Sequence, residues 1–299
     1  MDFLSIRQRL SQALIDHAPR DRSGDPGLDA AILRSTSNPG GLVRAALAYE
    51  SSLERGLGET EAEAIACGIE YFHLASLILD DLPCMDDAST RRGQPCLHRD
   101  HGEGAAILVS LTLISRAYTL LGAATAGLPE RDRLACQTLI DQALGARGLA
   151  GGQAADLSHS ADSRDARDTA RIALRKTGGL FILALLLPAI AGGATSRERS
   201  ALRAIAVYWS LAYQALDDAR DLVSSDAASG KSTGRDRLLG RPNLALVLGL
   251  PAARLRALRL AGLAERRIAG LAASGLGWSF LAEFQRVRFR PSGAGAQAA

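Results

Sequence analysis

The amino-acid sequence predicts an all-α protein that folds as a single large helical bundle, and three observations support this. Much of the hydrophobic 47% is Ala and Leu, which favour helices, while Val, Ile, Tyr and Phe are sparse. Apolar residues recur at helical spacing along all 299 residues, and no stretch alternates as a strand would. The breaks are short, so we expect residues 1–290 to form one domain and 291–299, PSGAGAQAA, to form a disordered tail.

Four helices are expected in the first half of the chain, each bounded by loop-forming residues. PRDRSGDPG at 19–27 follows the first helix, and SNPGG at 37–41 precedes the second. Pro83 ends the third because its ring blocks helical continuation, and GQP at 93–95 separates it from the fourth. The expected ranges are 2–17, 42–56, 60–81 and 103–125.

Five more helices are expected in the second half. The clearest loop chemistry lies in SSDAASGKSTG at 224–234 and in GRPN at 240–243, and the apolar spacing around these segments is helical. The expected ranges are 131–149, 164–191, 196–224, 244–271 and 275–288.

Composition argues against nucleic-acid and membrane partners. The formal charge is only +3 and the arginines are scattered, so we expect no nucleic-acid binding. TGGLFILALLLPAIAGGATS at 177–196 carries no charge and approaches the ~20 residues that span a bilayer. Pro188 and four glycines interrupt it and no second segment of this kind stands out, so a buried helix and no membrane span are expected. The four cysteines form no Cys-x-x-Cys pair, which favours idle thiols in the cytoplasm.

The first acidic cluster lies in SLILDDLPCMDDASTRRG, residues 76–93, directly after an apolar run. Asp80 and Asp86 are six residues apart, a spacing that places them on different faces of an ideal helix. Pro83 cannot continue that helix, so a short bulge through 82–85 would bring Asp86 back beside Asp80. The segment therefore predicts converging carboxylates at a helix end.

A second acidic cluster lies in YQALDDARDLVSS, residues 213–225, where Asp217 and Asp221 share one helix face and Asp218 flanks them. Either cluster alone could be a charged helix terminus. Converging carboxylates attract hard cations, and Mg²⁺ completes its shell with water and phosphate oxygens. The two clusters together predict a diphosphate that is bound through bridging Mg²⁺.

These motifs make the chain resemble the trans-isoprenyl diphosphate synthases, which condense allylic diphosphates with isopentenyl diphosphate. Asp-Asp-x-x-x-x-Asp followed by Arg-Arg-Gly stands at 80–93, and Asp-Asp-x-x-Asp stands at 217–221. GGQAADL at 151–157, KTGGLF at 176–181, Gln214 and Gly230–Lys231 complete the pattern. The resemblance covers residues 37–245 and is strongest to bacterial geranylgeranyl diphosphate synthases. It implies the isoprenoid synthase fold, a bundle around a central cavity.

The resemblance also implies roles for individual residues. Mg²⁺, with three ions when substrate is bound, would be held directly by Asp80, Asp86 and Asp217, and Asp81, Asp218 and Asp221 would act as further ligands or in supporting roles. The allylic diphosphate would be held by Arg91, Lys176 and Lys231, with Thr177 and Gln214 aiming oxygen atoms at the allylic cation. The homoallylic diphosphate would be held by Arg44, His73 and Arg92. A homodimer is expected, because the family is commonly homodimeric.

One departure concerns the homoallylic substrate. The family pattern Gly-Lys-Arg-x-Arg-Pro is replaced by GGLVRAA, so Gly41 stands where the lysine belongs and only Arg44 remains. Losing one charged hydrogen bond costs on the order of 1.5–3 kcal/mol, unless another cation compensates. Arg34 is one candidate for that cation.

Product length is expected to depend on the helix that carries the first acidic motif. A helical turn advances 5.4 Å, so the residues four, five and eight positions before Asp80 would contact a growing product tail at successive distances from the acidic motif. Ser76 and Ala75 are small, and Phe72 would form the floor. In this family a bulky aromatic at the fifth position typically stops growth at fifteen carbons, so we expect a C20 product, geranylgeranyl diphosphate.

Other functions are open at this point. Farnesyl diphosphate is the alternative product, and a terpene cyclase or lyase could use the same metal motifs without isopentenyl diphosphate. A non-catalytic partner subunit is disfavoured, because crowded carboxylates destabilise a fold unless they bind metal. SGKSTG at 229–234 is not a P-loop, because Ser225 stands where that motif needs its first glycine and no strand precedes it.

Overall fold

A computed structural model describes residues 3–21, 24–159, 165–223 and 239–289, and in these ranges helices joined by loops make up the fold, together with one small hairpin. The predicted all-α fold class is confirmed. The hairpin pairs β1 (Thr90–Arg91) with β2 (Gln94–Pro95). The helices are α1 (Phe3–Asp16), α2 (Pro26–Thr36), α3 (Val43–Glu54), α4 (Glu59–Asp80), α5 (Leu97–His101), α6 (Glu103–Thr125), α7 (Glu130–Leu144), α8 (Leu149–Leu157), α9 (Ala166–Lys176), α10 (Gly178–Ala191), α11 (Ser196–Asp221), α14 (Leu244–Leu248), α15 (Leu250–Ala273) and α16 (Phe280–Arg288).

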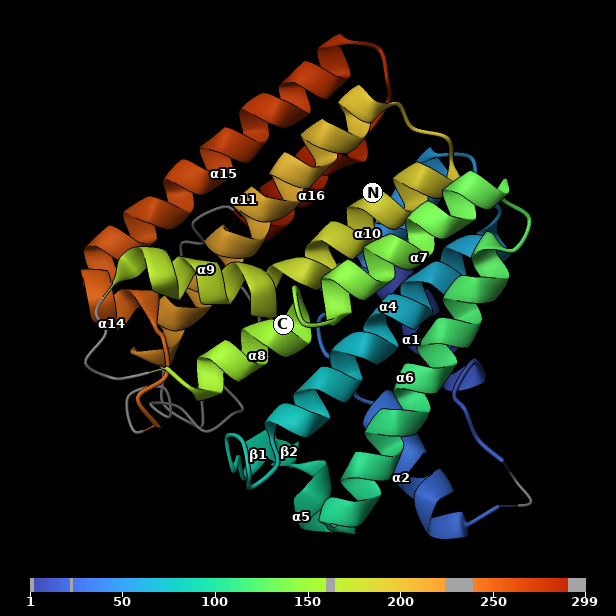
Figure 1. The fold of residues 1–299 in the computed structure, drawn as a ribbon, viewed down its shortest axis with the longest axis vertical. Helices are drawn as coiled ribbons and strands as arrows, with labels where there is room; N and C mark the ends of the chain where they lie inside the picture. Colours follow the sequence, from blue (N-terminus) through green and yellow to red (C-terminus); the bar gives the residue numbers. More distant parts are fainter. Residues whose placement is uncertain (1–2, 22–23, 160–164, 224–238, 290–299) are drawn as a thin grey trace.

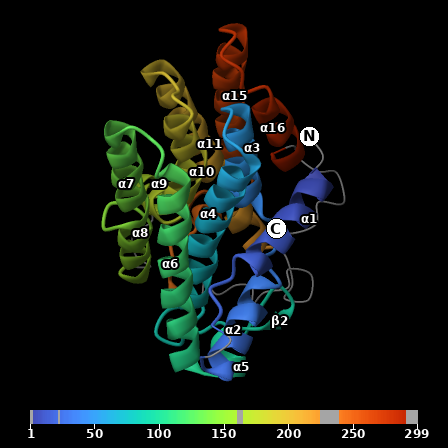
Figure 2. The same ribbon diagram turned by 90° about the vertical axis from the view of Figure 1, so that its right-hand side faces the viewer.

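Helix α4 occupies the interior of the bundle and delivers the first acidic motif at its C-terminal end. It packs against α6, α3 and α10, and Figure 2 shows it between these neighbours. The Tyr71 hydroxyl donates to the Leu14 carbonyl at 2.7 Å, which ties α1 to the same helix. The β1–β2 hairpin lies beside the end of α4 (Figure 1).

A second group of helices delivers the second acidic motif. Helix α11 packs against α10 and α15 (Figure 1), and α10 is buried along almost its whole length because it is apolar on all sides. Trp209 of α11 stacks on Phe289 with ring centroids 5.7 Å apart, and its indole N–H donates to Gln285 at 2.8 Å. These contacts fix the C-terminal helix α16 against α11.

Several element predictions were wrong. Helix α2 was not among the expected helices, yet Asp25 caps it and Pro26 occupies its first turn, a favoured pairing at a helix start. The short helices α5 and α8 and the hairpin were also missed. The expected helix 244–271 is broken at Gly249, whose φ of 82° is accessible mainly to glycine.

The expected helix 164–191 is also broken. It bends by 48° at Thr177, between α9 and α10. Gly152 of α8 packs so closely on the Lys176 backbone that a Cβ would not fit, and Gly179 approaches the Ala143 carbonyl in the same way. These close contacts set the position of the bend.

We expected no second segment that could span a membrane. By the criteria of length and composition alone, that expectation was wrong. Among the described residues α4 and α6 are both long and apolar enough, and the bent pair α9–α10 is a third candidate if it counts as one span. The most apolar part of α4 is 72% buried inside the bundle, but that of α6 is only 39% buried. Helix α6 therefore presents an apolar face to its surroundings.

Candidate active site

The first acidic motif forms a tight turn at the end of α4. The helix ends at Asp80, and the Met85 amide donates to the Leu82 carbonyl at 2.9 Å. The Asp86 amide then donates to the Asp80 carbonyl at 2.9 Å. The prediction that a bulge returns Asp86 to Asp80 is confirmed.

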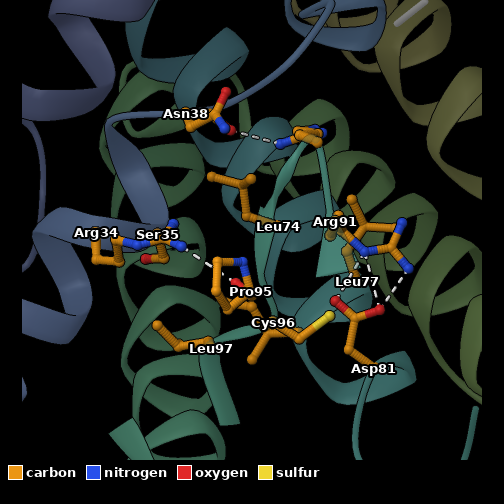
Figure 3. A pocket seen from close by; sticks show the side chains of 12 residues that line it. Arg34, Ser35, Asn38, Leu74, Leu77, Asp81, Arg91, Pro95, Cys96 and Leu97 are labelled. Atoms are coloured by element: carbon orange, nitrogen blue, oxygen red, sulfur yellow. Dashed lines mark hydrogen bonds and ion pairs between the residues drawn. The ribbon is translucent and has the colours of Figure 1, made fainter. Parts of the chain in front are cut away.

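Asp81 and Arg91 form a partly buried ion pair behind this turn. Arg91 of the hairpin donates through Nε and an Nη atom to Asp81, at 2.7 and 2.5 Å, as Figure 3 shows. Asp81 is only 3% exposed. Burial would lower the pKa of Arg91, but Asp81 raises it above its usual value, so the guanidinium stays charged. The pair fits the supporting role expected of Asp81 better than that of a metal ligand.

Lys176 lies at the bend between α9 and α10 and contacts two carboxylates. Its ammonium is 2.9 Å from Asp156 and 3.3 Å from Asp80. Burial would lower the pKa of Lys176, but Asp80 and Asp156 raise it above its usual value. The lysine is therefore a fixed positive charge beside the first acidic motif, and Gln153 also donates to Asp80.

Arg241 brings a second cation to the same motif. It donates to Asp86 at 2.9 Å and to the Met85 carbonyl at 3.0 Å, and it also reaches the Asp156 carbonyl at 3.3 Å. Burial and the nearby Asp80 raise the pKa of Asp86, while Lys176 and Arg241 act in the opposite direction. Asp80, Asp86 and Asp156 thus gather around two cations.

The second acidic motif lies in the last turns of α11, as predicted. Asp218 is 2% exposed and accepts from Gln214 at 2.7 Å and from the Leu244 amide at 2.7 Å. Those contacts fit a supporting role. Asp217 and Asp221 are partly exposed at the same helix end.

Two chains of contacts join the acidic motifs. Lys176 contacts Asp80, and the next residue, Thr177, donates to Gln214 at 2.8 Å, which in turn donates to Asp218. The short segment 241–244 makes a second link, because Arg241 binds Asp86 and the Leu244 amide binds Asp218. The motifs therefore face one site, which the bend at Thr177 helps to build.

Arg44, His73 and Arg92, expected to bind the homoallylic diphosphate, form a basic group next to this site. An Nη atom of Arg44 lies 3.4 Å from His73 Nε2, and Arg92 donates to the Asn38 carbonyl at 2.8 Å. Burial lowers the pKa of His73 well below its usual value, and Arg44 and Arg92 lower it further, so the imidazole is neutral at pH 7. Glu70 is buried among them and burial raises its pKa.

A small pocket lies beside the Asp81–Arg91 ion pair. It holds about 60 Å³, whereas small-molecule sites usually hold roughly 300–1,000 Å³. Figure 3 shows that pocket between α2, α4 and the hairpin, with Arg34 and Arg91 on its wall. None of the chain-length residues lines it: Phe72 and Ala75 are buried and Ser76 is partly buried.

Sequence reasoning missed part of this site. Asp156 and Gln153 were noted only as motif members, although their spacing of three places both on one face of α8. Arg241 carried no signal, because GRPN was interpreted as a loop. Lys231, expected to bind the allylic diphosphate, lies outside the described residues.

The donor chemistry of the site fits magnesium. Among the described residues no three His, Cys, Asp or Glu side chains converge tightly enough to hold a metal alone. Asp80 and Asp86 adjoin one another and supply oxygen ligands of the kind that Mg²⁺ prefers. An ion held there needs water and phosphate oxygens to complete its shell.

Comparison with known families decides the assignment. The family model described as "Polyprenyl synthetase" matches residues 26–266. The chain belongs to this family. The family prediction is thereby confirmed, and the matched range contains both acidic motifs and the cations between them.

Curated relatives of this polyprenyl synthetase include two bacterial enzymes named geranylgeranyl diphosphate synthase. The enzyme of Pseudescherichia vulneris is 40% identical over 190 residues, which cover 64% of this chain and 60% of that protein. The enzyme of Pantoea ananas is 33% identical over 246 residues, which cover 82% of this chain and 78% of that protein. Both names denote prenyltransferases, the class that the sequence predicted.

Solved structures agree on the fold. A geranyltransferase from Helicobacter pylori, complexed with magnesium and isoprenyl diphosphate, has a TM-score of 0.81 and 26% identity over 95% of this chain and 93% of that one. An FPP/GFPP synthase from Zymomonas mobilis has a TM-score of 0.79 and 26% identity over 95% and 94%. The isoprenoid synthase fold is confirmed.

Proposed function

We propose that this polyprenyl synthetase is a Mg²⁺-dependent prenyltransferase that condenses isopentenyl diphosphate with allylic diphosphates to give geranylgeranyl diphosphate. The observation that carries the proposal is the meeting of the two acidic motifs through Lys176, Thr177 and Gln214. The names of the bacterial relatives support the substrate class and the C20 product.

Ionisation of an allylic diphosphate produces a negative leaving group and a positive allylic carbon. The site contains groups that can stabilise each of them. Lys176 lies beside Asp80 as a permanent cation and would bind the diphosphate. Thr177 and Gln214 hold each other in place, so their oxygen atoms can face the developing allylic cation. Mg²⁺, with three ions proposed in the substrate complex, would neutralise the leaving diphosphate when held by Asp80, Asp86 and Asp217.

The basic group of Arg44, His73 and Arg92 would bind the second diphosphate without metal. Its neutral imidazole can donate a hydrogen bond, and its guanidinium groups match phosphate geometry. This basic group favours a transferase over a cyclase or lyase, which has no use for a second diphosphate site.

Product analysis tests the proposal. Purified protein, Mg²⁺ and farnesyl diphosphate should yield geranylgeranyl diphosphate only when isopentenyl diphosphate is added, as measured by mass spectrometry. Matched reactions with EDTA should yield none. A cyclic hydrocarbon formed without isopentenyl diphosphate would instead establish the cyclase alternative.

We further propose that the protein is a cytoplasmic homodimer. Helix α6 exposes Ile107, Leu108, Leu111 and Tyr118, each 49–62% exposed, and exposed apolar patches of this kind mark interaction surfaces. The chain carries nearly balanced charge, and a second copy would cover this face. All four cysteines are free, which suits a reducing compartment.

A charged side chain on the exposed face of α6 should separate the two copies of the proposed dimer. We expect Leu111→Glu to shift the sedimenting species from dimer to monomer at micromolar concentration, because a buried unpaired carboxylate is costly. Leu255→Glu on α15 is the control, since that leucine is 48% exposed on a different helix. Equal masses for the two variants would contradict the proposed interface, and recovery of the protein only with lipid would indicate membrane contact instead.

A further inference from the structure

Helix α15 carries a surface that the proposed reaction does not use. The helix packs against α11, α14 and α16, and it lies along the outer edge of the bundle with α11 on its inner side (Figure 1). Its buried side consists of Ala253, Ala257, Ala264, Ile268 and Leu271. The opposite side faces solvent along a helix of 24 residues, so it can contact a partner.

The solvent-facing side of α15 is strongly basic. Five arginines and one acid, Glu265, give the helix a net charge of +4, whereas the whole chain carries only +3. Sequence analysis treated the arginines as scattered, but the basic excess of the protein is concentrated on this one helix. In the ranges that the structure describes, no ion pair engages the four exposed arginines of α15, which are Arg254, Arg259, Arg266 and Arg267.

Two exposed leucines lie between these arginines. Leu255 and Leu258 are 48% and 47% exposed. Arg254 is four residues before Leu258, and Arg259 is four residues after Leu255, a spacing that places each arginine beside a leucine on one helix face. Arg266, seven residues beyond Arg259, continues the row of cations along the helix. The face therefore has an apolar centre with cations on both sides.

This arrangement fits the surface of an anionic lipid bilayer. Arginines that flank an apolar strip can bind lipid phosphates while the leucines enter the boundary between headgroups and acyl chains. A second copy of the chain is disfavoured on this face, because the same arginines would meet one another across a symmetric contact. Single-stranded nucleic acid is disfavoured because its bases stack on aromatic side chains, and α15 has none.

The two leucines lie near the end of α15 that adjoins the candidate active site. Ala253 packs with Ala219 of α11 in one buried cluster, and Ala219 directly follows Asp218 of the second acidic motif. Leu255 comes two residues after Ala253. If the proposed reaction is correct, its product has a C20 hydrocarbon tail, and a bilayer at this end of α15 would take up that tail as the product leaves.

We propose that the exposed face of α15, defined by Arg254, Leu255, Leu258, Arg259 and Arg266, docks the protein on anionic lipid bilayers. The contact is shallow, because the main apolar side of the helix is already packed on α11. Binding is therefore reversible and weakens with salt, which screens charges separated by more than about 10 Å at 0.1 M. The docking needs no membrane span, and α15 is not among the described helices that are long and apolar enough for one.

Flotation of the full chain with vesicles tests the inference. The protein should float with vesicles of equal parts phosphatidylcholine and phosphatidylglycerol, and should not float with phosphatidylcholine alone. Each arginine near an anionic surface strengthens binding about fivefold, so the combined Arg254→Gln, Arg259→Gln and Arg266→Gln variant should bind about a hundredfold more weakly. The combined Leu255→Ser and Leu258→Ser variant should bind about tenfold more weakly, because it loses the apolar contact.

A matched control removes the same charge from other surfaces. Arg20, Arg131 and Arg147 are exposed and lie outside α15, so changing all three to Gln should leave flotation within about threefold of the unmodified protein. Three results would each overturn the inference: no flotation with anionic vesicles, equal flotation with both kinds of vesicle, or equal losses in the α15 arginine variant and the control. The first result would leave an acidic protein as the partner of this face.

The test is independent of the proposed function. Condensation without vesicles should stay within about twofold in every variant, because exposed substitutions away from the site rarely disturb a fold. Absence of condensation in the unmodified protein would overturn the proposed function and would leave the vesicle result unchanged.

Discussion

Replacing Asp86 with Asn should lower kcat for prenyl transfer by about a thousandfold while the protein stays folded. Asp86 adjoins Asp80 and accepts from Arg241 at 2.9 Å, so its carboxylate is positioned by the turn that begins at Pro83. Asn keeps the shape but loses the charge that would hold Mg²⁺. Metal stabilisation of a leaving group is worth several kcal/mol, and about 4 kcal/mol corresponds to about a thousandfold in rate.

The neighbouring carboxylate provides a matched control. Asp87 is exposed and pairs with Arg99 at 2.6 Å, and its backbone φ of 46° is one that Asn also adopts. Exposed ion pairs contribute about 0–1 kcal/mol, so Asp87→Asn should change kcat less than about threefold. The Mg²⁺ concentration for half-maximal rate should rise in Asp86→Asn only. If the two variants had similar rates, Asp86 would not be a metal ligand.

Local chemistry explains which parts of the site the sequence could predict. The return of Asp86 to Asp80 follows from Pro83, because a proline three residues after the end of a strong helical run prevents the helix from continuing. The shared face of Asp217 and Asp221 follows from helical geometry alone. These positions depend on neighbours within a few residues, and the structure confirms both.

The remaining parts of the site depend on contacts between distant segments. The bend at Thr177 requires Gly152 from α8 against the Lys176 backbone, and the periodicity of 164–191 carries no trace of it. Arg241 reaches the acidic group from a segment that no local pattern connects to it. Departures from local rules concentrate at the candidate site.

Changing Ala75 to Phe should shift the main product from C20 to C15. Ala75 is buried on α4, five residues before Asp80, so a tail that extends along α4 from the metal site passes it at a depth of about 7.5 Å. Phe72 lies nearly one turn deeper and meets Tyr118 of α6 edge-on, with ring centroids 5.1 Å apart. That contact would fix Phe72 as the floor of the proposed tail path, so a second aromatic ring at position 75 would raise the floor by about one isoprene unit.

Product composition by mass spectrometry measures this shift independently of rate. Inserting a ring into packed space destabilises the folded protein by about 1–3 kcal/mol. Activities are therefore compared per amount of folded protein. Ala64→Phe is the control, because Ala64 is also a buried alanine of α4 but lies three turns further from Asp80, and it should leave C20 as the main product. Since Phe72 and Ala75 are buried, side chains between α4 and α6 must move to admit the tail. A C20 product from Ala75→Phe would therefore mean that the tail grows along a helix other than α4.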